Sequence, residues 1–185
     1  MVIWLLLGIL VVLVFWVIAL YNRLIGLRNQ VLNGWRQIDV QLKRRHDLIP
    51  NLVNTVRGAM EFERDTLTQV MEARARAVSA TGPADAARKE GELSQALGRL
   101  FAVAEAYPQL RASENFMQLQ EELTDTEDKI AAARRYYNAT VLRFNTRQQT
   151  FPTLIVASLF RFSPREFFEA GEDADAPIGV TFDRR

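Results

Sequence analysis

An uninterrupted apolar run at the start of the chain constrains its fold more than any other feature. Residues 2–20 read VIWLLLGILVVLVFWVIAL and contain no charged side chain. As a helix, this run spans about 28 Å at 1.5 Å per residue, which is enough to cross the hydrocarbon core of a bilayer. We therefore predict a transmembrane anchor over residues 1–21.

A secretory signal peptide is the main alternative for this run, because Val17 and Ala19 have the spacing of small residues before a cleavage site. The basic leading region of such a signal is absent, so an uncleaved anchor is the preferred interpretation. Trp4 and Tyr21 lie near the two ends of the run, where aromatic rings with a polar edge favour the headgroup zone. Together with Arg23, they are the predicted membrane-interface residues.

The charges that flank the run predict its orientation. Arg23, Arg28 and Arg36 follow it, whereas only the terminal amine precedes it. Basic residues close to a span resist translocation, although a domain of this length can be translocated despite them. We expect the amino terminus outside and residues 22–185 in the cytoplasm.

The body of the chain, over residues 22–150, has the spacing of amphipathic helices. Apolar residues recur at steps of three and four in four stretches, which cover residues 24–42, 52–78, 93–107 and 116–144. Four such helices joined by short connections pack most economically as an antiparallel bundle. The predicted fold class is therefore all-α, with a single N-terminal transmembrane helix followed by an antiparallel four-helix bundle.

Local signals predict where these helices end. Pro50 disfavours helical geometry at the residue before it, which favours a turn at residues 46–49 over a kink. The stretch SATGPADA at residues 79–86 has the composition of an exposed connector, which we expect to separate two helical hairpins. Ser113 is the expected N-cap of the fourth helix, which should end near Thr150. Gly26 and Gly34 are possible weak points in the first helix.

The C-terminal part divides into two segments. Residues 151–169 are rich in phenylalanine and too apolar to be left in water, so we expect them to pack on the bundle or to lie on the membrane. Residues 170–185 are acidic and then short and polar, which predicts a flexible tail.

Two clusters of opposite charge are the candidate partner or register patch. The bases are Lys43, Arg44 and Arg45, and the acids are Glu121, Glu122, Asp125 and Asp128. The simplest interpretation is that these faces lie side by side and set the register of the helices through exposed ion pairs. A basic belt near anionic lipid headgroups and a docking patch for a partner are the alternatives.

Composition excludes several classes of function. The chain has no cysteine, and its single histidine, His46, is expected at the surface or at its boundary rather than in a metal site. Asp125 and Asp128 share a helix face but are expected to be solvated rather than to hold magnesium. The net charge of +1 argues against nucleic acid as a partner. No catalytic motif is present, so we predict no catalytic residue, no cofactor, no small-molecule substrate and no enzymatic activity.

Three long stretches resemble the bacterial LemA family. They are NGWRQIDVQLKRRHDLIPNLVNTVRG at residues 33–58, the sequence from Leu100 to Asn145, and FPTLIVASLFRFSPREFFEA at residues 151–170. The resemblance implies one span in the bacterial inner membrane, a short external amino terminus and a helical body without established enzymatic activity. Members often occur near membrane proteases, and some relatives are associated with magnetosome membranes.

The chain departs from the pattern of the family at two places. Many relatives have a His-Glu pair where this chain has Phe62 and Glu63, and many have glycine where it has Arg161. The first difference makes an acid–base or metal role at that position hard to transfer to this chain.

These observations predict a membrane-anchored, non-enzymatic scaffold or adaptor. It would present faces of its bundle to other proteins, which include further copies of itself, as a homo-oligomer, or a membrane protease. A membrane-shaping or lipid-binding protein is the alternative, because the aromatic segment interleaves Arg161 and Arg165 with its rings.

Overall fold

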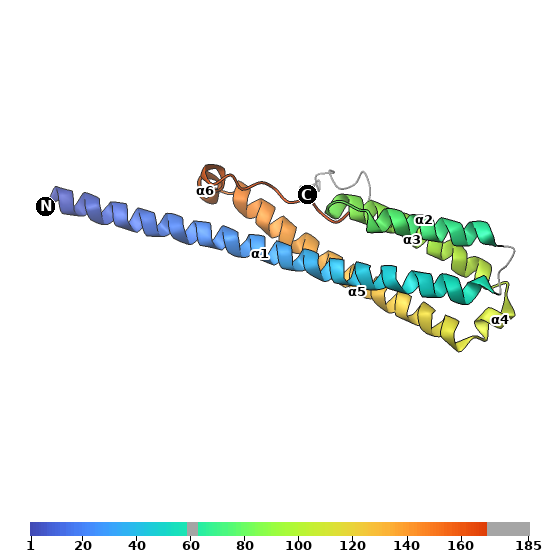
Figure 1. Cartoon of the computed structure of the whole chain (residues 1–185). Helices are drawn as coiled ribbons and strands as arrows, with labels where there is room; N and C mark the ends of the chain where they lie inside the picture. Colours follow the sequence, from blue (N-terminus) through green and yellow to red (C-terminus); the bar gives the residue numbers. More distant parts are fainter. Residues whose placement is uncertain (59–62, 170–185) are drawn as a thin grey trace, which may run out of the picture. The chain divides into compact units, whose positions relative to one another are not determined.

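The structure, a computed structural model, describes residues 1–58 and 63–169, and most of these residues are helical. The helices in these ranges are α1 (Val2–Arg57), α2 (Arg64–Val78), α3 (Pro83–Ala104), α4 (Pro108–Arg111), α5 (Glu114–Gln149) and α6 (Thr153–Leu159), as Figure 1 shows. The all-α class is confirmed, and these two ranges contain no strand. The predicted tail at residues 170–185 and Phe62 lie outside the described residues.

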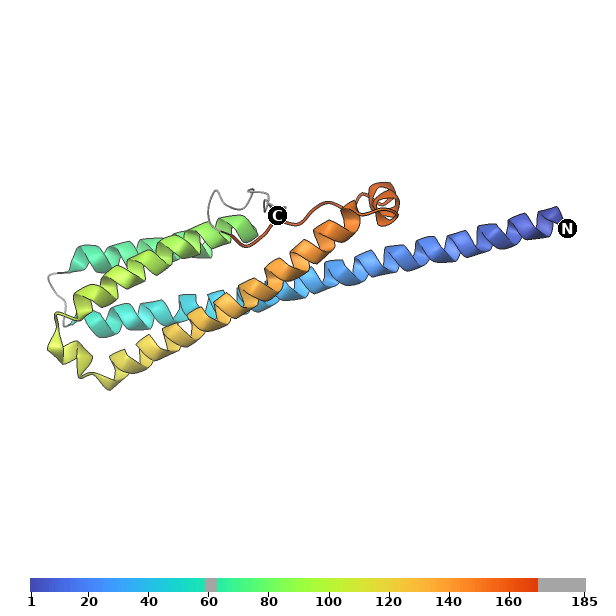
Figure 2. The same ribbon diagram turned by 180° about the vertical axis from the view of Figure 1, so that it is seen from behind.

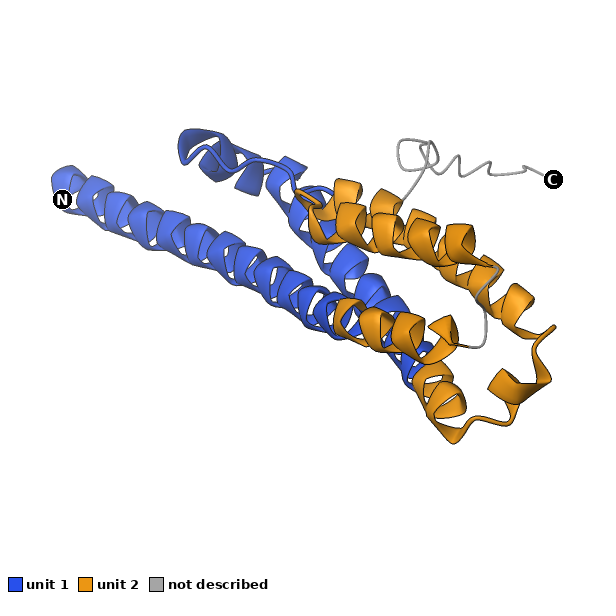
Figure 3. Ribbon diagram, turned by 45° about the vertical axis from the view of Figure 1, so that its right-hand side comes forward, with its two compact units in different colours: residues 1–45, 122–166 blue, residues 46–121, 167–185 orange. Residues whose placement is uncertain are grey.

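The helices divide into two compact units, which Figure 3 colours separately. Unit 1 comprises residues 1–45 and 122–166, and unit 2 comprises residues 46–121 and 167–185. The division falls inside α1 and inside α5, so each of these long helices contributes to both units. The prediction of one four-helix bundle over residues 22–150, and the domain limits that went with it, therefore stay predictions.

In unit 1, the surroundings of α1 change along its length. Every side chain from Met1 to Trp16 is exposed, although nearly all are apolar. From Leu20 onward, one face of the helix is buried, with Leu24 and Ile38 fully covered. The first part is a helix long and apolar enough to cross a membrane, and none of it is buried inside the protein.

The partly buried section of α1 in unit 1, from Leu20 onward, packs against α5. The rings of Trp35 and Tyr137 lie 5.8 Å apart, and Arg45 bonds to Glu127, so the two helices run antiparallel. Figure 2 shows α5 alongside this part of α1. The apolar stripe predicted for α5 is its buried face, which includes Ile130, Ala133, Tyr137, Val141 and Phe144. A Cβ atom on Gly34 would lie 3.3 Å from the Cα atom of Tyr137, so glycine permits the close approach of the two helices.

The turn predicted at residues 46–49 is wrong, because α1 continues through Pro50 to Arg57. Proline has no N–H group, so it cannot donate to the carbonyl four residues earlier, on His46. In unit 2, Nε of Arg74 on α2 donates to that carbonyl at 2.6 Å. A side chain thus supplies a hydrogen bond that the proline removes from the helix.

The prediction that residues 79–86 separate two hairpins is also wrong. Helix α3 begins at Pro83, and residues 79–82 join α2 directly to α3, which pack against each other in unit 2. Proline is favoured in the first turn of a helix, and Gly82 precedes it with a φ of 84°, which suits glycine. Residues 83–86 therefore start a helix instead of extending a loop.

The start of α5 agrees with its predicted cap. The N–H group of Phe116 donates to Oγ of Ser113 at 3.4 Å, and the helix begins at Glu114. It ends at Gln149, one residue before the expected end near Thr150.

The contrast between Gly26 and Gly34 gives a test of the packing in unit 1. Space around Gly26 is open, so Gly26→Leu should raise the free energy of unfolding by about 0.5–1 kcal/mol through helix propensity. Gly34→Leu should lower it by about 1–3 kcal/mol, because the side chain would have to displace Tyr137. Urea unfolding of both variants in mild detergent, followed by circular dichroism, measures the difference. Equal effects of the two substitutions would contradict the close approach at Gly34.

Candidate functional site

Part of the predicted charge patch comes together in unit 1. The guanidinium group of Arg44 lies 3.7 Å from the carboxylate of Glu122 and 3.6 Å from that of Asp125. All three side chains are about a third to a half exposed, so each pair contributes little to stability. A hydrogen bond from Lys129, followed by the charges of Lys129 and Arg44, holds the pKa of Asp125 below its usual value.

Arg45 differs from its neighbour because its side chain is 96% buried. Its guanidinium group donates to Oε2 of Glu127 at 3.0 Å, and Glu127 was not among the predicted site residues. Removal of a buried charge partner is costly, whereas an exposed pair contributes little. Arg45 therefore fixes the register of α1 against α5 more firmly than Arg44 does.

The other predicted members of the patch do not join these pairs. Lys43 and Asp128 are exposed, and no ion pair of either is found within residues 1–58 and 63–169. Glu121 is exposed as well, and no ion pair of it is found among the described residues. The patch that the structure shows is thus a set of ion pairs between α1 and α5 in unit 1.

An open groove lies beside these contacts on unit 1. It has a volume of about 620 Å³ and is lined by Val40 and Tyr136 together with Arg36, Lys129 and small residues of α5. Val40 is 61% exposed and Tyr136 is 45% exposed, so both present apolar surface to the surroundings. Sequence reasoning missed this face, because Val40 falls outside the periodic stripe and Tyr136 adjoins a buried Tyr137.

Unit 2 contains a polar cluster that sequence reasoning also missed. Nε2 of His46 lies 2.5 Å from Oε1 of Glu90, whose side chain is 94% buried. The ring sits at the boundary of the surface, as predicted, but it has a carboxylate partner. The sequence contained a signal for a buried carboxylate that needs a partner, because Glu90 occupies a position on the apolar stripe that contains Ala86, Leu93 and Leu97.

This cluster offers little for chemistry. The hydrogen bond occupies one ring nitrogen of His46, and the described residues contain no group of three metal-ligating side chains. Glu90 is covered, so the pair has no open face for a substrate. Its geometry suits the fastening of α3 to the end of α1 within unit 2.

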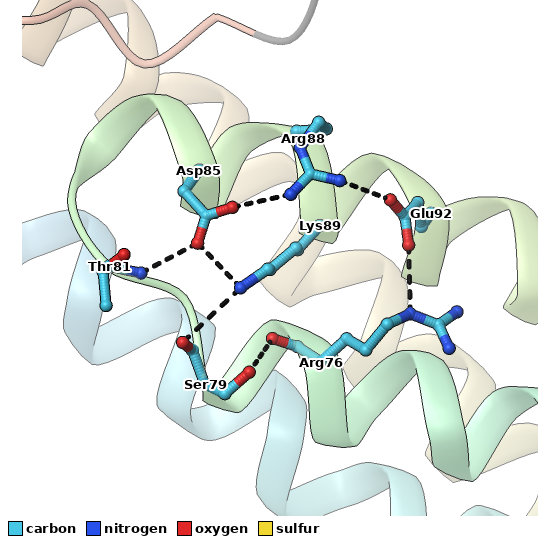
Figure 4. A network of polar contacts seen from close by, with 7 residues as sticks. All are labelled: Arg76, Ser79, Thr81, Asp85, Arg88, Lys89 and Glu92. Carbon is cyan, nitrogen blue, oxygen red and sulfur yellow. Dashed lines mark hydrogen bonds and ion pairs between the residues drawn. The ribbon is translucent and has the colours of Figure 1, made fainter.

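A chain of ion pairs holds the connection between α2 and α3 (Figure 4). Asp85 accepts from the backbone N–H of Thr81 and pairs with Lys89 at 2.7 Å and with Arg88 at 2.8 Å. Arg88 pairs in turn with Glu92, which also bonds to Arg76 on α2. The hydrogen bond from Lys89, together with the one from Thr81, lowers the pKa of Asp85 to about 2.

This network predicts a measurable pH dependence. The folded pKa of Asp85 lies below its unfolded value of 3.8, so its stabilising contribution is present above pH 3.8 and is lost as the pH falls towards 2. Carboxyl NMR shifts should show Asp85 titrating near pH 2 in the unmodified chain. In Lys89→Met the midpoint should rise towards 3.8, whereas Lys129→Met should leave it unchanged. A midpoint that Lys89→Met does not move would contradict the network.

The aromatic segment is fastened to α5 in unit 1 by side-chain hydrogen bonds to its backbone. Asn145 donates to the carbonyl of Arg165 at 2.9 Å and accepts from its N–H group at 2.8 Å. The hydroxyl of Tyr137 donates to the carbonyl of Glu166 at 2.8 Å. Burial raises the pKa of Tyr137 to about 12, so this hydroxyl keeps its proton at neutral pH.

Helix α6 ends in a turn that has arginine where glycine is usual. Arg161 has a φ of 54°, its N–H group donates to the carbonyl of Ser158, and that of Phe162 donates to the carbonyl of Ala157. These two bonds define a Schellman motif, in which the residue with positive φ is most often glycine. The departure from the glycine of many relatives therefore falls at a position with a physical reason for glycine.

The predicted interface residues have different surroundings. Trp4 is 77% exposed, and Arg23 is exposed as well. Tyr21 is partly covered, because its ring lies 4.7 Å from that of Phe160 and 5.9 Å from that of Phe162. The end of the apolar run and the aromatic segment therefore meet within unit 1.

Comparison with known proteins agrees with the resemblance seen in the sequence. The sequence model of the LemA family matches residues 34–182. Protein LemA of Metamycoplasma hominis is 29% identical over 82% of this chain and 69% of its own length. Magnetosome protein MamQ of Magnetospirillum gryphiswaldense and Magnetosome protein MamQ 1 of Paramagnetospirillum magneticum are each 24% identical over 85% of this chain and 68% of their own lengths.

Proposed function

We propose, from the premise that the chain belongs to the LemA family, that it is a single-pass membrane protein whose helical body acts as a non-enzymatic scaffold or adaptor. The observation that carries the proposal is the change along α1 from exposed apolar side chains to a buried stripe that begins at Leu20. Exposed apolar surface of this extent is stable in lipid and unfavourable in water. The same helix then continues into the packed body.

The direction of insertion is part of the proposal. Arg23, Arg28 and Arg36 favour a cytoplasmic body and an external amino terminus in the bacterial inner membrane.

The chain has no cysteine, so a single introduced thiol reports its own position. A membrane-impermeant maleimide should label Val2→Cys in spheroplasts and should label Val78→Cys only after lysis, and the reverse pattern would contradict this orientation.

The scaffold role is supported by what the body presents. Its charge clusters are largely engaged in register contacts, and its His–Glu pair is covered, whereas the groove at Val40 and Tyr136 leaves apolar surface open. The names of the relatives denote no reaction. The body therefore offers contact surface, for copies of itself or for another membrane protein such as a protease.

Assembly in the membrane tests this role. The purified full chain in mild detergent should have a particle mass above that of one chain, and crosslinking in native membranes should trap the same species. Val40→Lys should shift the mass towards one chain, because it places a charge in the groove. Val78→Lys is the matched control, since Val78 is similarly exposed on unit 2. Monomers alone at every protein level would contradict the proposal.

A lipid-binding role is the second candidate, and one observation favours it. Leu154, Ile155 and Leu159 on α6 are exposed, while the same segment contacts Tyr21 at the end of the apolar run. Exposed apolar side chains at that level would enter the interface of the bilayer.

A fluorophore on the introduced thiol distinguishes this role. In vesicles that contain the full chain, a label on Leu159→Cys should be quenched by nitroxide-bearing lipid, and a label on Val78→Cys should not. Equal quenching at the two positions would remove the lipid-binding candidate.

A further inference from the structure

A small cavity in unit 1 gathers three arginines next to the end of the apolar run. Its volume is about 130 Å³, and its polar lining comes from Arg28, Arg161, Arg165, Tyr21 and Ser163. Three phenylalanine rings complete the wall. This volume corresponds to about four water molecules at about 30 Å³ each. We propose that the cavity binds the phosphate group of a phosphate ester or of free phosphate.

The charges in the cavity lack a counterpart within the described chain. Arg44, Arg45, Arg76 and Arg88 each pair with a carboxylate. Within residues 1–58 and 63–169, no carboxylate lies within ion-pair distance of the three cavity arginines. Guanidinium groups concentrated without an acid attract an anion.

Two of these arginines also have buried polar atoms to satisfy. The Nε atoms of Arg28 and Arg165 are shielded from solvent and have no hydrogen-bond partner within the described residues. A buried donor without an acceptor costs free energy. Phosphate oxygens accept from guanidinium groups in the paired geometry that arginine favours. Tyr21 and Ser163 also line the cavity, and each carries a hydroxyl group that can donate a hydrogen bond.

The backbone around the cavity is held in place before any ligand binds. Asn145 makes two hydrogen bonds to the backbone of Arg165. The rings of Phe160 and Phe162 both pack against Tyr21, and the ring of Phe162 lies 6.3 Å from that of Phe144. A site fixed in this way loses little conformational freedom on binding.

Arg161 is the most informative of the three arginines. Its φ of 54° is unfavourable for a residue with a side chain and would be relaxed by glycine. What arginine adds at this position is a third guanidinium group on the cavity. The substitution Arg161→Gly should therefore preserve or improve the fold while it weakens the binding of an anion.

The phosphate group has two candidate sources, and the position of the cavity bears on the first. Tyr21 directly follows the apolar run, so the headgroup of an anionic phospholipid would lie at the level of the cavity. That source rests on the proposed membrane anchor. Binding of free phosphate does not rest on it, since it needs only the three arginines.

Thermal unfolding of the full chain in neutral detergent tests the site. At constant ionic strength, inorganic phosphate in one arm and short-chain phosphatidylglycerol in the other should raise the midpoint in a saturable way. Arg161→Gly and Arg28→Gln should each lower the affinity for the ligand that saturates the shift by about tenfold or more. Arg161→Gly should also keep or raise the midpoint without ligand. Arg143→Gln is the matched control, because Arg143 is exposed on α5 and does not line the cavity.

Each outcome decides the proposal. Saturation by phosphate alone identifies a free anion as the ligand, and saturation by phosphatidylglycerol alone identifies a headgroup, so both support the site. Absence of saturation in both arms overturns it, as does equal weakening by Arg143→Gln. Failure of the anchor would appear separately, as full chain missing from the membrane fraction, and would leave the phosphate arm interpretable.

Discussion

Close antiparallel packing of α1 against α5 in unit 1 is the constraint on which the rest of that unit depends. Gly34 lets the two backbones approach, and Tyr137 fills the space that a side chain at residue 34 would occupy. With this contact in place, Arg45 meets Glu127 further along the pair. The aromatic segment after α5 then lies against Tyr21. One register thus aligns the buried stripe, the ion pair of the buried Arg45 with the exposed Glu127, and the cavity of three arginines.

Periodicity in the sequence predicts most of the helical content and much of the core. The stripes that begin at Leu24 and at Phe116 are buried faces, and Ser113 caps α5 as its hydroxyl chemistry suggests. These features depend on spacing or on neighbours in the chain, which a sequence displays directly. The proposed interaction groove was not predicted, because exposure of Val40 depends on which partner covers the helix.

One error, the turn predicted at residues 46–49, arises where a distant side chain overrides a local preference. Pro50 would end many helices, but Arg74 supplies the donor that its backbone lacks, and that donor comes from another helix. Glu90 looks like an isolated carboxylate on an apolar stripe until His46 is placed beside it. Arg161 likewise occupies a turn that favours glycine, so its presence gains a reason only once the cavity is known.

The hydrogen bond from Arg74 to the carbonyl of His46 has a consequence for how unit 2 opens. The part of α1 in unit 2, from His46 to Arg57, is joined to α2 by this side chain, so fraying of one should release the other. Amide protons of these two segments would then exchange with solvent as a single cooperative group. A proline inside a helix would in this way define the edge of a foldon without ending the helix.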